Sequence, residues 1–249
     1  LNKVYFIIHS VTSIEILKNY PQKRFSEIKE RIRIYKKKPS VCVSEGVKLD
    51  LEKLLKNYAH PSITKIYNGI QKEAIVEASN KDFDDIIKNC IIHVGKFNIA
   101  KRQDKLIKVY SRIQSDYPLV FIGKGPELKA SKVLTKRLNL LDKVHFLGYK
   151  KNPYPYIKNA RLIVLCSDFE GLGMVILEAI SLNTSIISSN CPNGPKEILD
   201  DKHLFACNDN QQFEEKLKNA INNHDDFQAT LKEQFCADYM VKKYLDLIN

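Results

Sequence analysis

The chain has 249 residues, of which 44% are hydrophobic and 28% are charged. This is the composition of a globular protein, and the length suffices for two ordinary domains. No run approaches the roughly 20 apolar residues that span a bilayer, and no signal peptide is recognisable. Composition therefore excludes wholesale disorder and gives no sign of a membrane-spanning helix.

The six cysteines are scattered and form no CxxC pair; they are Cys42, Cys90, Cys166, Cys191, Cys207 and Cys236. Several lie inside apolar runs, where cysteine usually behaves as a small buried hydrophobe. We therefore expect a reducing, cytoplasmic compartment and no zinc cluster.

Forty basic residues against twenty-nine acidic ones give a formal net charge of +11. Nucleic acid, an anionic membrane surface or phosphorylated small molecules could each explain such an excess. The lysine-rich segments 23–38 and 150–158 are either solvated surface or a patch that faces membrane phospholipid. No recognition helix, aromatic RNA platform or zinc finger is visible, so we expect no nucleic-acid partner.

The N-terminal third predicts a few strands and helices of an α/β layer. Strands are expected at Val4–Ile8 and Ser40–Val43, and helices over about 22–37 and 46–56. Ser44 fits the N-cap of the second helix, because its hydroxyl can accept a free backbone N–H. These strands are too few for a complete Rossmann-like domain. Because the chain enters a strand directly after Leu1, we expect residues 1–88 to form a partial N-terminal domain.

From residue 90 onward, apolar runs of strand length alternate with amphipathic helical stretches. The expected strands cover 90–94, 119–122, 144–147, 162–166 and 185–188, and the expected helices cover 103–114, 126–138, 154–159 and 173–182. This alternation predicts a parallel sheet with helices on both faces, whose ligands bind at the carboxyl ends of the strands. We expect a complete domain over 89–230, and a C-terminal helix within 231–249 that packs back on the N-terminal part.

The segment from Ser167 to Met174 combines a strand end, a glycine-bearing loop and a helix start. A helix N-terminus attracts anions, which suits a diphosphate. Glu170 lies before this helix and Glu178 more than one turn inside it, so the two cannot share a proton. Ionised carboxylates accept hydrogen bonds from paired hydroxyls, so the pair suits two ends of a long ligand. For Glu178 alone, a carboxylate favoured by the helix dipole is the alternative.

Two lysines follow the neighbouring strand, in the segment Gly95-Lys96-Phe97-Asn98-Ile99-Ala100-Lys101. Both would stand at the carboxyl end of that strand. Cations there could neutralise a departing diphosphate, whose charge grows in the transition state. The alternative is that Lys96 and Lys101 are ordinary exposed lysines.

Together these segments resemble a known enzyme family. Glu170 and Glu178, with seven residues between them, resemble the E-x7-E signature of retaining glycosyltransferase family 4, which has the two-domain GT-B fold. HVGKFNIAKRQDKLI (93–107) is similar to the family's strand–G-R–x4–K–helix segment, FIGKGPE (121–127) to its hxGxGP loop, and VHFLGY (144–149) to its next strand. CPNGPKEIL (191–199) resembles a segment common in bacterial surface-polysaccharide transferases, and VCVSEGVKLDL (41–51) the end of the N-terminal domain. The implied fold class is α/β with GT-B-like Rossmann domains, the donor domain complete and the acceptor-side domain partial.

The resemblance also implies roles for single residues. Glu178 would bind the donor ribose, Glu170 the transferred sugar, and Lys96 and Lys101 the diphosphate. His9 matches the histidine that stands beside the donor sugar. The remaining donor-binding positions would be Gly95, Gly123, Gly171, Leu172, Gly173 and Met174. Lys96 stands where the family usually has arginine, so a bidentate phosphate contact becomes a point charge.

The expected function is retaining transfer of a hexose or N-acetylhexosamine from a nucleoside-diphosphate sugar to a glycan or lipid-linked acceptor, in lipopolysaccharide- or capsule-type biosynthesis. A UDP-sugar is the preferred donor, and another nucleoside-diphosphate sugar is the alternative. No cofactor or metal is expected. The acidic pairs Asp84-Asp85 and Asp225-Asp226 are interpreted as carboxylates on helix surfaces, and lysines with a helix N-terminus would take the place of a divalent cation. The expected location is the cytoplasm, with peripheral contact to the anionic inner face of the plasma membrane. One alternative is a fragment or subunit that binds the nucleotide sugar without turnover. Another, from a different class, is a basic adaptor for membranes or nucleic acid.

Overall fold

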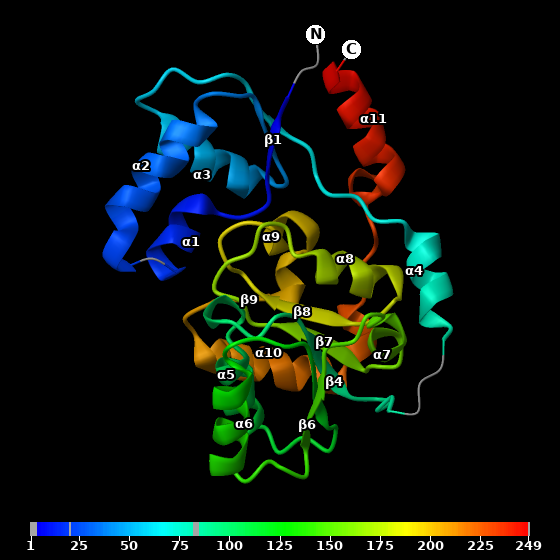
Figure 1. Cartoon of the computed structure of the whole chain (residues 1–249). Helices are drawn as coiled ribbons and strands as arrows, with labels where there is room; N and C mark the ends of the chain where they lie inside the picture. Colours follow the sequence, from blue (N-terminus) through cyan, green and yellow to red (C-terminus); the bar gives the residue numbers. More distant parts are fainter. Residues whose placement is uncertain (1–3, 20, 82–84, 249) are drawn as a thin grey trace.

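The computed structural model describes residues 4–19, 21–81 and 85–248. It contains two parallel sheets, one of three strands in the order β1-β2-β3 and one of six strands in the order β6-β5-β4-β7-β8-β9. Figure 1 places the small sheet above the large one, with the two ends of the chain near each other at the top. The hydroxyl of Tyr5 donates to the carbonyl of Leu247 at 3.4 Å, which joins the two ends of the chain.

The small sheet comes from the first 65 residues. Its strands are β1 (Phe6–Ile8), β2 (Ser40–Cys42) and β3 (Ile63–Lys65), and its helices are α1 (Thr12–Asn19), η1 (Pro21–Lys23), α2 (Arg24–Tyr35) and α3 (Glu45–Leu55). Ser44 caps α3 as expected: its hydroxyl accepts the N–H of Val47 at 3.2 Å. The basic helix expected over 22–37 is confirmed in essence, although it opens with a 3-10 turn.

Helix α4 (Lys72–Ser79) follows the small sheet, but it packs against two helices of the large sheet, α7 (Tyr154–Lys158) and α8 (Met174–Ser181). We call each sheet with its helices a unit. The chain crosses between the units a second time near its end, where Ile70 forms a parallel bridge with Cys236. Gly69 N–H also approaches the sulfur of Met240 in α11 (Ala237–Ile248) at 3.2 Å. Segments on the two sides of residue 88 are therefore interleaved, and the domain division made from the sequence stays a prediction.

The large sheet has the doubly wound order of a Rossmann-like fold. Its strands are β4 (Ile91–Val94), β5 (Leu119–Ile122), β6 (Val144–Gly148), β7 (Leu162–Leu165), β8 (Ile186–Ser189) and β9 (Leu204–Phe205). β4 is the first strand in sequence, and its neighbours are β5 and β7, so the chain reverses direction across the sheet between β4 and β7. Ligands bind at such a switch point, beyond the carboxyl ends of the two strands.

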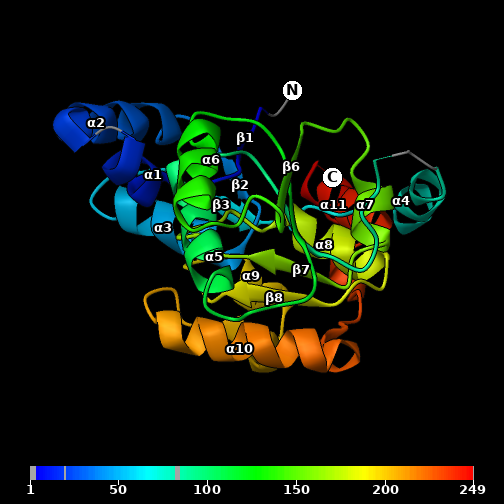
Figure 2. The ribbon, with the colours of Figure 1, turned by 90° about the horizontal axis from the view of Figure 1, so that it is seen from below.

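Helices cover both faces of this sheet. They are η2 (Ile99–Lys101), α5 (Gln103–Tyr110), α6 (Leu128–Arg137), α7 (Tyr154–Lys158), α8 (Met174–Ser181), α9 (Pro195–Ile198), η3 (Asp201–His203), α10 (Asn210–Asn222), η4 (His224–Phe227) and η5 (Glu233–Phe235). One hydrophobic cluster joins the strands to α7, α8 and the small sheet, and a second joins them to α5 and α10. Figure 2 shows α8 and α10 on opposite sides of β7 and β8. Strands buried on both faces read as continuous apolar runs, which explains why the sequence revealed them.

The expected strand 119–122 has the observed bounds, the C-terminal helix expected within 231–249 is α11, and the other expected elements are found within a few residues. The helix expected over 103–114 is wrong at its end. α5 stops at Tyr110, Gln114 adopts a left-handed φ of 46°, and the Tyr110 hydroxyl donates to Tyr117 O at 2.8 Å. These contacts turn the chain early into β5. Helices α1, α4 and α10 were not expected.

No helix within the described ranges is long and apolar enough to cross a membrane.

All six cysteines are free thiols, and Cys42, Cys90, Cys166 and Cys191 are buried, in agreement with their expected role as small hydrophobes. Burial raises the pKa of the Cys42, Cys90 and Cys166 thiols to about 12, so they stay protonated and unreactive near neutral pH.

Candidate functional site

A cavity of about 950 Å³ opens at the switch point, where the loops after β4 and β7 face the end of β1. Residues from both units line it. All eleven residues that the sequence singled out are in this lining: His9, Gly95, Lys96, Lys101, Gly123, Glu170, Gly171, Leu172, Gly173, Met174 and Glu178. Folding thus brings together the residues chosen from separate segments, whereas their individual roles stay predictions.

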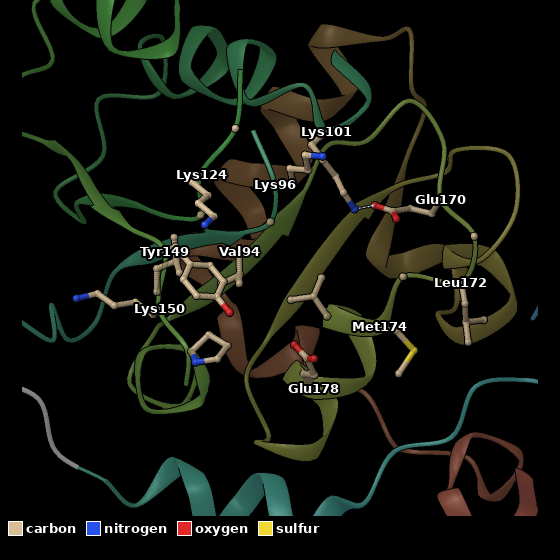
Figure 3. A pocket seen from close by; sticks show the side chains of 18 of the residues that line it. Val94, Lys96, Lys101, Lys124, Tyr149, Lys150, Glu170, Leu172, Met174 and Glu178 are labelled. Carbon is tan, nitrogen blue, oxygen red and sulfur yellow. Dashed lines mark hydrogen bonds and ion pairs between the residues drawn. The ribbon is translucent and has the colours of Figure 1, made fainter. Parts of the chain in front are cut away.

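Lys101 and Glu170 form an ion pair on one wall of this cavity (Figure 3), with Lys101 Nζ 2.5 Å from Glu170 Oε1. The Ser167 hydroxyl donates to the same oxygen at 2.6 Å, and Glu170 is only 8% exposed. The sequence assigned Lys101 to the diphosphate and Glu170 to the sugar, and the structure places them in direct contact. A ligand that binds here therefore meets a coupled pair of charges.

The two site loops are tied together behind this ion pair. Arg102 Nη1 lies 3.1 Å from Asp168 Oδ1, and Arg102 Nε lies 3.0 Å from Asp104 Oδ1. The N–H of Asp168 donates to Ala100 O at 2.8 Å. These contacts join the loop after β4 to the loop after β7, so the ion pair is positioned before any ligand arrives.

His93 lies beneath the loop that carries Lys96. Its Nδ1 is 2.8 Å from Val164 O and its Nε2 is 3.3 Å from Gln103 Nε2. Burial, the largest cause, lowers the pKa of His93 to about 4, so the ring is neutral near pH 7, with its proton on Nδ1 donated to the carbonyl. Gln103 Nε2 also donates to Lys96 O at 3.0 Å, which fixes the backbone from which the Lys96 side chain extends.

Glu178, the fifth of the eight residues of α8, enters the cavity opposite the ion pair (Figure 3). Burial raises the pKa of its carboxyl group, and its charge in turn adds to the burial that raises the pKa of Tyr154. Among the described residues, no cation forms an ion pair with Glu178. A half-buried carboxylate that forms no ion pair has oxygen atoms that can accept hydrogen bonds from the hydroxyls of a ligand.

The loop before α8 lies directly against the end of β1. A Cβ atom on Gly171 would lie 1.9 Å from the carbonyl oxygen of His9, so only glycine allows this approach. Helix α8 itself begins at Met174, after Gly173 with φ 92°. Met174 and Val175, the first two residues of this helix, line the cavity, and the first N–H groups of a helix have no partner within it.

Sequence reasoning missed a second group of lining residues, on the side of the cavity formed by β5 and β6. Lys124 follows β5, and its Nζ lies 5.1 Å from the ring centre of Tyr149, a side chain that is 63% exposed. Lys150 pairs with Asp85. Figure 3 shows Lys124 above the Tyr149 ring. Lys124 belongs to the segment FIGKGPE, so its place in a glycine loop after a strand was a signal for it.

No cluster of three or more histidine, cysteine, aspartate or glutamate side chains that could hold a metal ion exists in residues 4–19, 21–81 and 85–248. The charged groups that face the cavity are instead lysines and two separate glutamates. Amines, like the backbone N–H groups at a helix start, are donor groups that suit an anionic ligand.

Fold and cavity together define an α/β domain with a cavity at its topological switch point, the place where sheets of this kind bind ligands. The chain belongs to the family "Glycosyl transferases group 1": residues 72–235, well over half of it, match the family model. This is the retaining family GT4 with the GT-B fold, so the family and fold class expected from the sequence are confirmed.

Several curated proteins are similar to the chain. It is 27% identical over 237 residues to the N-acetylgalactosamine-N,N'-diacetylbacillosaminyl-diphospho-undecaprenol 4-alpha-N-acetylgalactosaminyltransferase of Campylobacter jejuni, a match that covers 89% of the chain and 64% of that protein. It is 25% identical over 224 residues to the lipopolysaccharide 1,6-galactosyltransferase of Escherichia coli, covering 84% and 61%. A match to an uncharacterised glycosyltransferase of Methanocaldococcus jannaschii reaches 35% identity over 49% of the chain and 32% of the relative. The chain thus spans between about a third and two thirds of these relatives.

Solved structures share the fold over nearly the whole chain. Anabaena HepE, in complex with UDP and glucose, superposes with a TM-score of 0.83 at 15% identity, over 99% of this chain and 71% of HepE. Staphylococcus aureus TarM, in a complex that contains UDP, superposes with a TM-score of 0.80 at 20% identity, over 99% and 51%. At these identities the likeness concerns the fold alone.

Proposed function

We propose that this chain binds a UDP-sugar in the switch-point cavity and serves in retaining transfer of a hexose or N-acetylhexosamine. The observation that carries the proposal is the convergence, in one cavity, of the Lys101–Glu170 ion pair, the N-terminus of α8 and the half-buried Glu178. Family membership and solved relatives that contain UDP support the same donor.

In the proposed complex the diphosphate lies between the two carboxylates. Lys101 and Lys96 neutralise it together with the N–H groups at the start of α8. Glu178 accepts hydrogen bonds from the two hydroxyls of the ribose, and Glu170 accepts hydrogen bonds from hydroxyls of the transferred sugar. Lys101 then contributes to binding of both the sugar and the diphosphate, because it contacts Glu170 and lies beside the phosphates. Gly95, Gly123 and the loop from Gly171 to Met174 line the donor.

Tyr149 and Lys124 suit the base of the nucleotide. The exposed Tyr149 ring offers an aromatic face, and a base stacked on an aromatic side chain gains about 1–3 kcal/mol. Lys124 stands over the same ring and adds a cation near the carbonyl edge of a pyrimidine. We therefore place the base at the mouth of the cavity, beside Tyr149.

The proposed chemistry is a front-face substitution. The bond from the anomeric carbon to the β-phosphate oxygen breaks, and its electron pair stays on the phosphate. The acceptor oxygen bonds to the same face of that carbon, and its proton passes to the leaving phosphate oxygen. Lys96, Lys101 and the N-terminus of α8 stabilise the charge that grows on the diphosphate. His9, at the end of β1, lines the cavity and in this proposal stands beside the donor sugar.

We further propose a glycan or lipid-linked acceptor in lipopolysaccharide- or capsule-type synthesis at the cytoplasmic face of an anionic membrane. Two similar proteins carry names of that kind. Residues 23–38 hold eight basic and two acidic side chains, and Phe25 within them is 78% exposed. Basic side chains beside an exposed aromatic ring favour an anionic lipid surface.

Titration calorimetry with UDP and GDP, beside a transfer assay on the same sample, tests the proposal. Lys101→Met should weaken UDP binding about 10–100-fold, because a hydrogen bond to a charged group contributes about 1.5–3 kcal/mol. Lys108→Met is the matched control, since Lys108 is exposed on α5 and pairs with Asp104 outside the cavity. Absence of UDP binding by the wild type, or equal affinities of the two variants, would contradict the site.

A second candidate is binding of the nucleotide sugar without turnover, in a chain that needs a further segment or a partner. The observation that favours it is coverage, because the match extends over 32% to 64% of the curated relatives described above. UDP binding with no transfer and no donor hydrolysis would support this candidate. UDP binding together with transfer would reject it.

A further inference from the structure

The segment 190–199, which contains the CPNGPKEIL motif, carries a charged contact that donor binding does not use. Glu197 in α9 reaches across to the small sheet, where its Oε2 accepts the N–H of Glu45 at 2.8 Å and its Oε1 accepts the N–H of Gly46 at 3.1 Å. Both N–H groups belong to the first turn of α3. A carboxylate at a helix N-terminus is stabilised by the free N–H groups and by the helix dipole.

This capping is shared between two distant parts of the chain. The Ser44 hydroxyl accepts the N–H of Val47. Glu197, more than 150 residues later in the chain, accepts the N–H groups of Glu45 and Gly46. Tyr67, next to β3, is hydrogen-bonded to Glu197 as well, and burial together with this carboxylate raises the pKa of Tyr67. Glu197 therefore contacts both the start of α3 and the residue Tyr67 beyond the end of β3.

The same segment also packs against the loop from Gly171 to Met174, which we call the donor loop. Gly194 has φ 87°, and a Cβ atom there would lie 2.5 Å from the carbonyl oxygen of Leu172, which lines the cavity. On its other side, Asn193 packs on α3 so closely that a Cβ on Gly46 would lie 1.6 Å from Asn193 Oδ1. Segment 190–199 thus lies between the donor loop and the start of α3.

Helix α3 in turn is coupled to His9. The strand before it continues to Val43, whose N–H donates to Ile8 O at 3.2 Å, one residue before His9. His9 O is the atom against which Gly171 packs. The contacts therefore link the donor loop to itself by way of the small sheet. Leu172 contacts Gly194, and Glu197 of the same segment binds the start of α3. The strand before α3 pairs with β1, whose end contacts Gly171.

We propose that Glu197 is a positioning residue: by binding the N-terminus of α3 it holds the small sheet, and with it His9, in place over the donor loop. The inference rests on the proposed function only for the role of His9, the residue that is positioned. The Glu197 side chain is absent from the cavity lining, so it acts through α3 and Leu172 and not on the ligand itself.

Hydrogen exchange followed by mass spectrometry tests this on the full chain, with Glu197→Gln and the control Lys196→Ala. Lys196 is exposed on the same short helix. In Glu197→Gln, the amides of Glu45 and Gly46 should exchange about tenfold faster, because the lost charge and one mismatched N–H weaken the cap. Exchange at His9–Val11 should rise as well, whereas β7 and the UDP dissociation constant should change less than about threefold. Glu197→Asp, which keeps the charge, should recover part of the protection.

Unchanged exchange at Glu45 and Gly46 would overturn the proposal. So would a uniform rise that includes β7, since it would make Glu197 a general stability residue. Wild-type protein that fails to bind UDP would refute the proposed function instead, and the exchange comparison would still decide whether Glu197 holds α3.

Discussion

Replacing Glu178 by glutamine should make the protein more stable and its donor site weaker. The carboxyl group is half-buried in α8, burial raises its pKa, and it has no cation partner among the described residues. An acid whose pKa is raised on folding binds its proton more tightly in the folded state. Ionisation of Glu178 therefore costs stability, and this cost appears as the pH rises above the unfolded pKa of about 4.3 toward the raised folded value.

The expected gain is modest and measurable. Removal of a functional charge that is poorly solvated typically stabilises a protein by about 0.5–2 kcal/mol. For a chain of this size, about 1 kcal/mol corresponds to a rise in melting temperature of about 2–4 °C. UDP should bind about 10–100-fold more weakly, since hydrogen bonds from the ribose hydroxyls to a charged acceptor are worth about 1.5–3 kcal/mol.

Differential scanning calorimetry at pH 4 and pH 8, and titration calorimetry with UDP at pH 7, provide the two measurements. The difference in melting temperature between Glu178→Gln and wild type should be present at pH 8 and vanish at pH 4. Glu215→Gln, on the exposed face of α10, is the control that should change neither property. A variant that is less stable at pH 8, or that binds UDP within twofold of wild type, would refute the reasoning.

Three further predictions concern the elements around the cavity. Stability should fall by up to about 3 kcal/mol as the pH drops from 6.5 toward 4, because the depressed pKa of His93 means that the unfolded state binds its proton first; acid titration followed by circular dichroism should show a shallower fall in His93→Asn. Ser44→Ala should lower the free energy of unfolding in urea by about 1 kcal/mol through loss of the α3 cap. Gly171→Ala should cost about 1–3 kcal/mol in the same assay, since its Cβ would collide with His9 O, and an unchanged midpoint would show that this contact is loose.

The large sheet could be predicted from the sequence because its strands are buried on both faces. Ile91–Val94, Leu119–Ile122 and Leu162–Leu165 appear as apolar runs between polar turns, and this local pattern survives in any arrangement of the sheet. Helix α10 was not recognised, because its mean hydropathy is low and only one narrow stripe, which includes Phe213 and Leu217, is buried.

The site residues could be chosen because glycines and charges cluster just after strand ends, which a parallel sheet brings to one edge. Strand order, however, depends on pairing between distant segments, so the neighbourhood of β4 and β7 was decided only by the fold. The ion pair between Lys101 and Glu170 joins side chains 69 positions apart, and the sequence had placed them on different parts of the donor.

For the features at the centre of the proposal, the sequence alone determined which residues carry charge at the ends of strands and where α8 begins. Only the tertiary structure decided that, within the part of the chain it describes, Glu170 is paired with a cation and Glu178 is not, and that Glu197 caps α3. The physical reason is range. Helix starts and strand runs follow from neighbours within a few residues, whereas burial and charge pairing depend on which distant surfaces the folded chain presses together.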